Sequence, residues 1–79
     1  MRKQQYELYK KANDRIASNI QRLIKKAKWT VEKLAVESDL DKSNLYNMMN
    51  GKINFTMRAL VKIETALETD ISELFRKNL

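Results

Sequence analysis

Apolar residues recur every three or four positions along most of the chain, which is the spacing of an amphipathic helix. The first stripe predicts a helix over residues 8–28 and consists of Leu8, Ala12, Ile16, Ile20, Leu23, Ile24 and Ala27. Asn13 and Asp14 interrupt this stripe with poor helix formers. The stretch is therefore either two helices or one helix with a weak point.

Polar residues that can accept hydrogen bonds from free backbone amides mark the starts of four further helices. These capping residues are Thr30, Asp41, Thr56 and Asp70. Apolar pairs with the spacing of a hydrophobic staple accompany the first three, namely Trp29–Leu34, Leu40–Leu45 and Phe55–Leu60. Asp70 and Glu73 have the spacing of a capping box.

These signals predict helices over Val31–Glu37 and Lys42–Asn50, a fourth helix after Thr56 and a short last one after Asp70. Gly51 directly follows the third helix, where a left-handed residue commonly ends a helix. It is the one glycine in 79 residues, and proline is absent. Because tight hairpins need such turn residues, the composition favours an all-α domain of five helices.

The composition argues against catalysis, since the chain has no histidine and no cysteine. Disulfides, zinc fingers, cysteine nucleophiles and histidine-activated serines are excluded. We expect no enzyme activity, no cofactor, no metal site and no small-molecule ligand. The chain also has no apolar run near the roughly 20 residues of a membrane span, and we expect it to be cytoplasmic.

Positive charge is concentrated in the first part of the chain. Residues 1–30 carry nine basic and two acidic side chains, whereas residues 31–79 carry seven basic and eight acidic ones. A basic sector on a near-neutral body indicates a polyanionic partner, which is either nucleic acid or an anionic membrane surface. A solvated helix face explains the same charges without a partner.

The second and third predicted helices, joined by a short turn, have the proportions of a helix-turn-helix motif. Ala35 supplies the small side chain that is needed where the two helices cross. Leu34, Leu45 and Met48 point inward in this register, which leaves the outer face of the third helix polar.

The chain here resembles the Cro and phage-repressor type of helix-turn-helix domain, over about residues 16–75. The resemblance is carried by Leu34-Ala35, Leu40-Asp41, Leu45, Gly51-Lys52, the stretch from Leu60 to Leu67, and Leu74-Phe75. It implies a compact repressor-type domain over residues 16–79, with residues 1–15 as an N-terminal extension. The chain departs from the family pattern at Val31, Asp39, Lys42, Met49 and Phe55, and two of these positions, Val31 and Lys42, replace glutamines.

The motif gives eleven residues a candidate role in DNA binding. The expected contacts to base edges come from Lys42, Ser43, Asn44 and Asn47. The expected contacts to the DNA backbone come from Thr30, Lys33, Tyr46, Asn50, Lys52, Asn54 and Thr56. For Tyr46, the alternative is that it only covers the junction of the two helices.

The expected partner is double-stranded DNA, bound by a homodimer, because one recognition helix reads only a few base pairs. The resemblance also includes restriction-modification controllers and antitoxins. A protein-interaction module on the same fold and a membrane-surface role for residues 1–28 are the rival functions. Tyr6, Leu8 and Tyr9 in the extension indicate either packing on the body or a second subunit, or a basic tail along phosphates; a disordered terminus is the remaining alternative.

Overall fold

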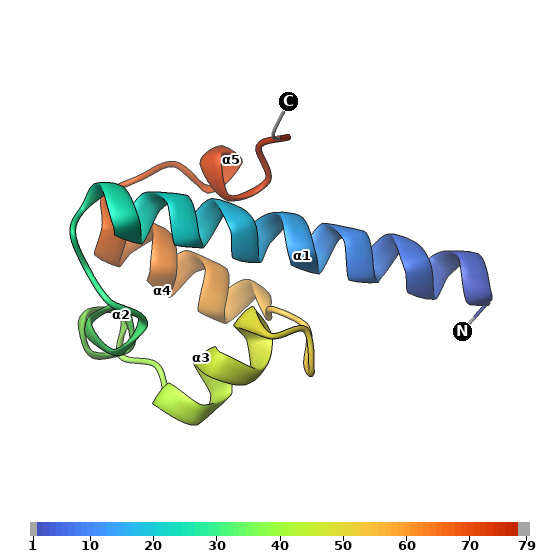
Figure 1. The fold of residues 1–79 in the computed structure, drawn as a ribbon, viewed down its shortest axis with the longest axis horizontal. Coiled ribbons are helices and arrows are strands. Elements are labelled where there is room, and N and C mark those ends of the chain that lie inside the picture. The colour runs from blue at the N-terminus through green and yellow to red at the C-terminus, as the bar shows by residue number, and fades with distance from the viewer. Residues whose placement is uncertain (1, 78–79) are drawn as a thin grey trace.

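A computed structural model describes residues 2–77 of the chain. Its helices, in chain order, are α1 (Lys3–Lys26), α2 (Val31–Ser38), α3 (Lys42–Met49), α4 (Met57–Leu67) and α5 (Ile71–Leu74). No strand occurs in this range (Figure 1). The predicted all-α fold with five helices is confirmed.

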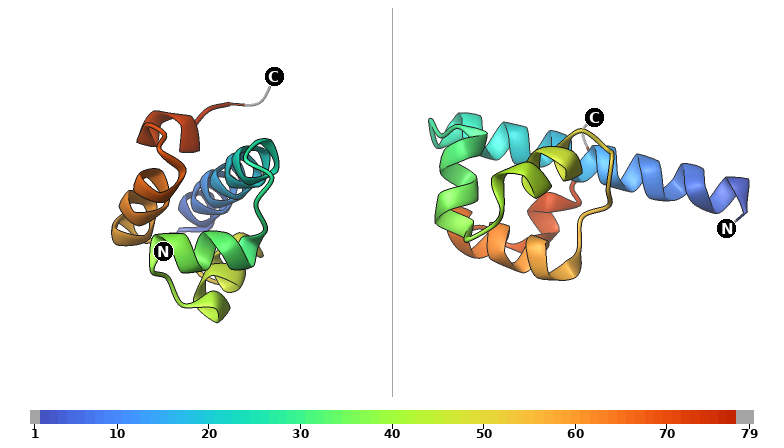
Figure 2. Two further views of the ribbon diagram at one scale, coloured as in Figure 1. Left: turned by 90° about the vertical axis from the view of Figure 1, so that its left-hand side faces the viewer. Right: turned by 90° about the horizontal axis from the view of Figure 1, so that it is seen from below.

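The first helix, α1, is a single helix of 24 residues that runs along the whole body (Figures 1 and 2). Asn13 does not break it. Instead Asn13 is buried, and so are Ile16, Ile20 and Ile24 on the predicted stripe. Leu8 and Ala27 are exposed, so the prediction that the apolar stripe packs in the core at these two residues is wrong. A domain boundary between residues 15 and 16 stays a prediction, and α1 continues through that point.

The second and third helices begin at the predicted capping residues. The side-chain oxygen of Thr30 accepts from the Lys33 amide at 3.1 Å, and that of Asp41 accepts from the Asn44 amide at 3.0 Å. Asp39 lies between the two helices in the left-handed conformation, with φ 55°. Each cap satisfies amides that the first turn of a helix leaves unpaired, which fixes where the helix starts.

The third helix ends before Gly51, which has φ +76° and thus takes the left-handed conformation predicted for it. Thr56 caps α4 by accepting from the Ala59 amide at 3.0 Å. At α5 only half of the predicted capping box forms. Asp70 accepts from the Ser72 amide at 3.1 Å, whereas the Glu73 carboxylate lies 4.0 Å from the guanidinium of Arg76.

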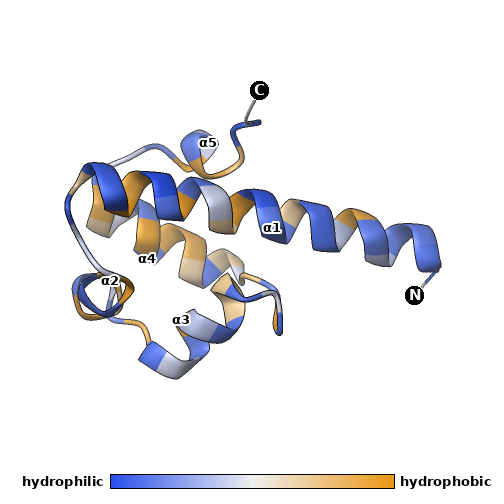
Figure 3. Cartoon of the chain, in the orientation of Figure 1, coloured by the Kyte–Doolittle hydropathy of each residue, from blue (hydrophilic) through white to orange (hydrophobic). Residues whose placement is uncertain are grey.

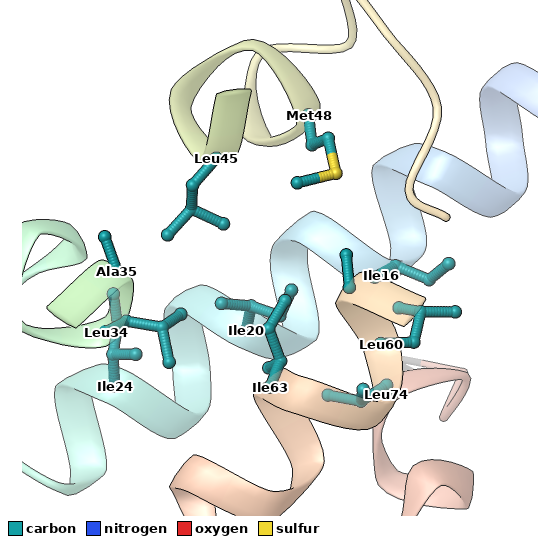
Figure 4. Packing of buried hydrophobic residues seen from close by; sticks show 11 residues of the cluster. Ile16, Ile20, Ile24, Leu34, Ala35, Leu45, Met48, Leu60, Ile63 and Leu74 are labelled. Atoms are coloured by element: carbon teal, nitrogen blue, oxygen red, sulfur yellow. The ribbon is translucent and has the colours of Figure 1, made fainter. Parts of the chain in front are cut away.

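A core of eleven buried apolar residues, drawn from all five helices, holds the domain together (Figure 4). Ile20, Leu34, Leu45, Ile63 and Leu74 are its fully buried members. Figure 3 shows hydrophobic segments along α4 and mostly hydrophilic ones toward the N-terminal end of α1. The apolar side chains of α3 face this core, so the opposite face of α3 is left to solvent.

Candidate nucleic-acid interface

The helices α2 and α3 pack against each other and form a helix-turn-helix unit at one side of the body (Figure 1). Ala35, which is 4% exposed, provides the small side chain at their contact. Leu45 and Met48 anchor α3 from behind, because both are buried in the core. The first turn of α3 carries Lys42, Ser43 and Asn44, all exposed.

A hydrogen bond across the front of this unit joins the two helices. The phenol of Tyr46 on α3 donates to Oε2 of Glu32 in the first turn of α2, over 2.6 Å. The bond lowers the pKa of the Glu32 carboxyl and raises the pKa of the Tyr46 phenol, with Lys42 adding a smaller lowering effect on Glu32. A negative charge therefore lies beside α3, where the positive end of the α2 dipole stabilises it.

The last turn of α3 is held from the opposite side by Asn13 of α1. The Asn13 amide nitrogen donates to the Met48 carbonyl at 3.0 Å, and its oxygen accepts from the Phe55 amide at 3.0 Å. Asn13 is 5% exposed; its bond to the Met48 carbonyl is buried, and its bond from the Phe55 amide is partly buried. One side chain thus fixes both the end of α3 and the end of the loop that follows it.

The turn between α2 and α3 is held by a third element, α4. The Lys62 ammonium donates to the carbonyl oxygen of Asp39 at 3.0 Å, and it lies 3.8 Å from the carboxylate of the same residue. A left-handed aspartate is strained relative to glycine. The contact with Lys62 offsets part of that strain and ties the turn to the body.

One protein-family model matches the chain, over residues 19–78. Its description is a Cro/C1-type helix-turn-helix DNA-binding domain. The chain belongs to this family. No curated protein and no solved structure matches it. The expected resemblance is confirmed, and the helix-turn-helix of the family corresponds here to α2, the turn at Asp39 and α3.

The Cro/C1-type motif presents most of the predicted base-reading residues to solvent. Lys42, Ser43 and Asn44 are exposed, and within residues 2–77 no hydrogen bond engages the side chain of Asn44. Asn47 is half-buried because the chain folds back over it. The Asn47 carbonyl accepts from the amides of Lys52 and Ile53 at 2.9 and 3.3 Å.

The residues predicted to contact the DNA backbone fall into two groups and one exception. Asn50, Lys52, Asn54 and Thr56 are exposed along the loop between α3 and α4, and Thr30 and Lys33 are exposed at the start of α2. The hydroxyls of Thr30 and Thr56 already accept from helix amides, but a hydroxyl still has a proton to donate to a phosphate. Tyr46 is the exception, since its proton is given to Glu32.

Lys33 is partly engaged within the protein. Its ammonium lies 5.4 Å from the centre of the Trp29 ring and 4.0 Å from the Glu37 carboxylate. Both contacts are at the surface and of modest strength, so they orient the side chain without removing its charge.

Sequence reasoning missed three residues that position this interface, namely Asn13, Glu32 and Lys62. For Asn13 a signal was present, because the residue stands three positions before Ile16, on the face of the helix that forms the apolar stripe. A polar side chain on a buried face needs a partner. For Glu32 and Lys62 the sequence carries no comparable signal, since both are ordinary charged residues on amphipathic helices.

Two further properties concern what the described residues lack. None of the helices in residues 2–77 is both long and apolar enough to cross a membrane. The same part of the chain contains no group of three acidic, histidine or cysteine side chains arranged to hold a metal ion.

Proposed function

We propose that the protein is a small transcriptional regulator of the bacterial or phage type, which binds specific double-stranded DNA sequences and reads the major groove with α3. The observation that carries the proposal is the first turn of α3 in a Cro/C1-type domain. Its side chains are polar and exposed. The helix behind them is anchored by the buried side chains of Leu45 and Met48 and by the hydrogen bond from Asn13 to the Met48 carbonyl. A rigid, polar helix face is what major-groove readout requires.

In this proposal Lys42, Ser43, Asn44 and Asn47 meet base edges. Asn44 has the amide donor and acceptor that pair with N6 and N7 of adenine. Asn50, Lys52, Asn54 and Thr56 bind phosphates beside the groove, and Thr30 and Lys33 bind them at the start of α2. Tyr46 contacts the backbone through its ring, because its hydroxyl is bonded to Glu32.

The protein acts as a homodimer in the cytoplasm, on sites with two half-sites about one helical turn apart. A single α3 of eight residues reaches only a few base pairs. A second copy supplies the rest of the specificity. A dimer of such small domains on a promoter would repress transcription by covering the duplex.

The test is a selection of bound sites from a random duplex library, for which we expect a palindrome. Affinities of Asn44→Ala and Asn54→Ala are then measured by fluorescence anisotropy on the selected site and on an unrelated duplex. The two variants lose the same amide group, one from the predicted base contacts and one from the predicted backbone contacts. Asn44→Ala should lose about 1–3 kcal/mol on the selected site only.

Asn54→Ala should weaken binding to both duplexes by a similar factor. If Asn44→Ala also weakens both duplexes equally, Asn44 is a backbone contact and the proposed register of α3 in the groove is wrong. If the wild-type chain binds no duplex at micromolar concentration and low salt, the DNA-binding function itself is refuted.

A further inference from the structure

Four basic side chains of α1 form a row along the outer side of the helix. At about 100° per residue, Lys11, Arg15, Arg22 and Lys26 lie within about 60° of one another, on the side opposite the fully buried Ile20. Lys11 and Lys26 are exposed, and Arg15 and Arg22 are half-buried. We refer to these four basic residues as the basic stripe.

The acidic residues of α1 do not accompany the basic stripe. Glu7 and Asp14 are the two carboxylates of this helix, and both fall on one flank of it, together with Lys3 and Lys10. That flank is neutral, because it carries two charges of each sign. The positive charge of α1 is therefore concentrated on the side of the helix that faces away from the body.

The described part of the protein does not neutralise the basic stripe. Lys11 precedes Arg15 by four residues and Arg22 precedes Lys26 by four, a spacing at which like charges destabilise a helix. Within residues 2–77, no ion pair joins any of the four to an acidic side chain. Arg22 donates instead to the neutral side-chain oxygen of Asn19, over 3.5 Å. A bound polyanion would relieve the repulsion along the stripe.

An open groove continues the positive surface at the C-terminal end of α1. Its walls include Arg22, Lys26 and Arg76, together with the carboxylates of Glu68 and Glu73. The Glu73 carboxylate lies 4.0 Å from the Arg76 guanidinium, which is typical of a weak surface pair. The stripe and Arg76 together carry five positive charges against two negative ones, so the surface stays cationic.

The basic stripe and the proposed base-reading face of α3 lie on opposite sides of the domain. The two helices flank the core (Figures 1 and 2). Ile20 of α1 and Leu45 of α3 are both fully buried in that core. The outer sides of the two helices therefore face away from each other, and a duplex along α3 leaves the stripe open to another partner.

We infer that the basic stripe binds the phosphate backbone of a second double-stranded DNA segment, so that one molecule bridges two duplexes. The inference rests on the proposed function for the first duplex and goes beyond it for the second. Contact through the stripe is electrostatic and independent of sequence, because lysine and arginine meet phosphates there rather than base edges.

The length of the basic stripe fits a nucleic-acid backbone. Lys11 and Lys26 are separated by about 22 Å along the helix axis, at about 1.5 Å per residue. Phosphates of one DNA strand follow one another every 3.4 Å or so along the duplex, so the stripe matches a run of about six phosphates. The long stems of lysine and arginine let four cationic groups adjust to such a run.

An anionic membrane surface fits the stripe less well than DNA does. A helix that lies on a membrane inserts a broad apolar face beside its basic one. The apolar face of α1 is used by the core, where Ile16, Ile20 and Ile24 are at most 5% exposed. Leu8, which is 65% exposed, gives the outer side of α1 one large apolar side chain and no apolar face.

The test is a bridging assay with the full chain. A duplex with the selected site is fixed to beads and saturated with protein, and a labelled duplex of unrelated sequence is then titrated at low salt. The stripe variant Lys11→Gln/Lys26→Gln removes two exposed charges from the basic stripe. The matched control Lys3→Gln/Lys10→Gln removes two exposed charges from the neutral flank of the same helix.

We expect the wild type to capture the labelled duplex. At equal occupancy of the beads, the stripe variant should bind it about tenfold more weakly, and the control should stay within about twofold of the wild type. The slope of the logarithm of this affinity against the logarithm of salt concentration should fall by about 1.8 in the stripe variant, since each lost phosphate contact removes about 0.9.

Three results overturn the inference. If the stripe variant captures as much labelled duplex as the wild type, the bridge is made by the α3 helices of two copies. If the stripe variant and the control lose equally, only the net charge matters. If the wild type captures no labelled duplex, the stripe does not bind DNA, and loss of binding to phosphatidylserine vesicles in the stripe variant alone would assign it to a membrane surface.

Failure of the proposed function gives a different result. If α3 does not read DNA, the wild type selects no site and Lys42→Gln leaves its binding to an unrelated duplex unchanged. The stripe variant should still weaken that binding. This outcome supports the contact between the basic stripe and DNA and refutes only the reading of the major groove by α3.

Discussion

Replacing Asn13 by alanine should weaken the domain, because its buried side chain links α1 to α3 and to the loop that follows α3. The change removes a buried hydrogen bond to the Met48 carbonyl and a part-buried one from the Phe55 amide, each 3.0 Å long. The Met48 carbonyl still accepts a hydrogen bond from the Gly51 amide at 3.2 Å, so it does not become unpaired. The Phe55 amide loses its side-chain acceptor on a part-buried backbone group.

The expected cost follows from these two bonds. A lost hydrogen bond costs about 0.5–1.5 kcal/mol, and a buried amide left without a partner costs about 1–3 kcal/mol. Alanine is a better helix former than asparagine, which stabilises the folded variant by about 0.6 kcal/mol. The net loss is therefore about 1–4 kcal/mol, which corresponds to a fall in Tm of about 4–30 °C in a domain of this size.

The measurement is thermal and urea unfolding followed by circular dichroism. Ser18→Ala is the matched control, because Ser18 is exposed on the same helix and tests the gain in helix propensity alone. Asn13→Asp keeps an acceptor for the Phe55 amide but no donor for Met48, and it should fall between wild type and Asn13→Ala. If Asn13→Ala melts within 2 °C of Ser18→Ala, the two hydrogen bonds of Asn13 do not stabilise the domain as argued here.

Three further outcomes can be checked with single variants. Leu45→Ala should cost about 2–5 kcal/mol in urea unfolding because Leu45 is fully buried, whereas Val36→Ala, at a site 77% exposed, should stay within about 0.5 kcal/mol. Glu32→Gln should tighten binding to any duplex several-fold by removing a negative charge beside α3, and Glu64→Gln on α4, which removes the same charge, should not. The stability difference between wild type and Tyr46→Phe should persist from pH 5 to pH 9. It should shrink below the ordinary Glu32 value of 4.5, since the pKa of Glu32 is lowered on folding. It should shrink again above the ordinary Tyr46 value of 10.0, since the pKa of Tyr46 is raised. An unchanged difference at both ends of that range would mean that the bond contributes nothing.

The starts of α2, α3 and α4 could be predicted from sequence because their causes are local, whereas α1, expected over residues 8–28, begins five residues earlier, at Lys3. Thr30, Asp41 and Thr56 each bond an amide three residues away, and a short stretch of sequence contains both partners. The left-handed conformation of Gly51 could be predicted for the same reason, since a glycine directly after a helical stretch commonly ends the helix in this conformation. The predicted ends of α2 and α3 differ from the observed ones by one residue each, which is ordinary variation at a helix end.

The contacts that position the candidate site could not be predicted, because their partners are far apart in sequence. Asn13 bonds groups 35 and 42 residues away. In the sequence it stands beside Asp14 as a second poor helix former, which is why a weak point in the helix was expected there. Only the fold shows that this residue faces the end of α3. The same holds for Lys62, whose partner Asp39 is 23 residues away.

The short helix α3 is held at its start, middle and end by different parts of the chain. Asp41 caps its first turn, Tyr46 ties its middle to Glu32 of α2, and Asn13 of α1 holds its last turn. A helix of eight residues has little stability of its own, so its orientation depends on these contacts and on the core behind it. Loss of Asn13 or Glu32 should thus alter DNA binding without any contact to DNA. Such positioning residues differ from base contacts in one measurable respect. They change affinity for all duplexes together, whereas a base contact such as that proposed for Asn44 changes the preference among them.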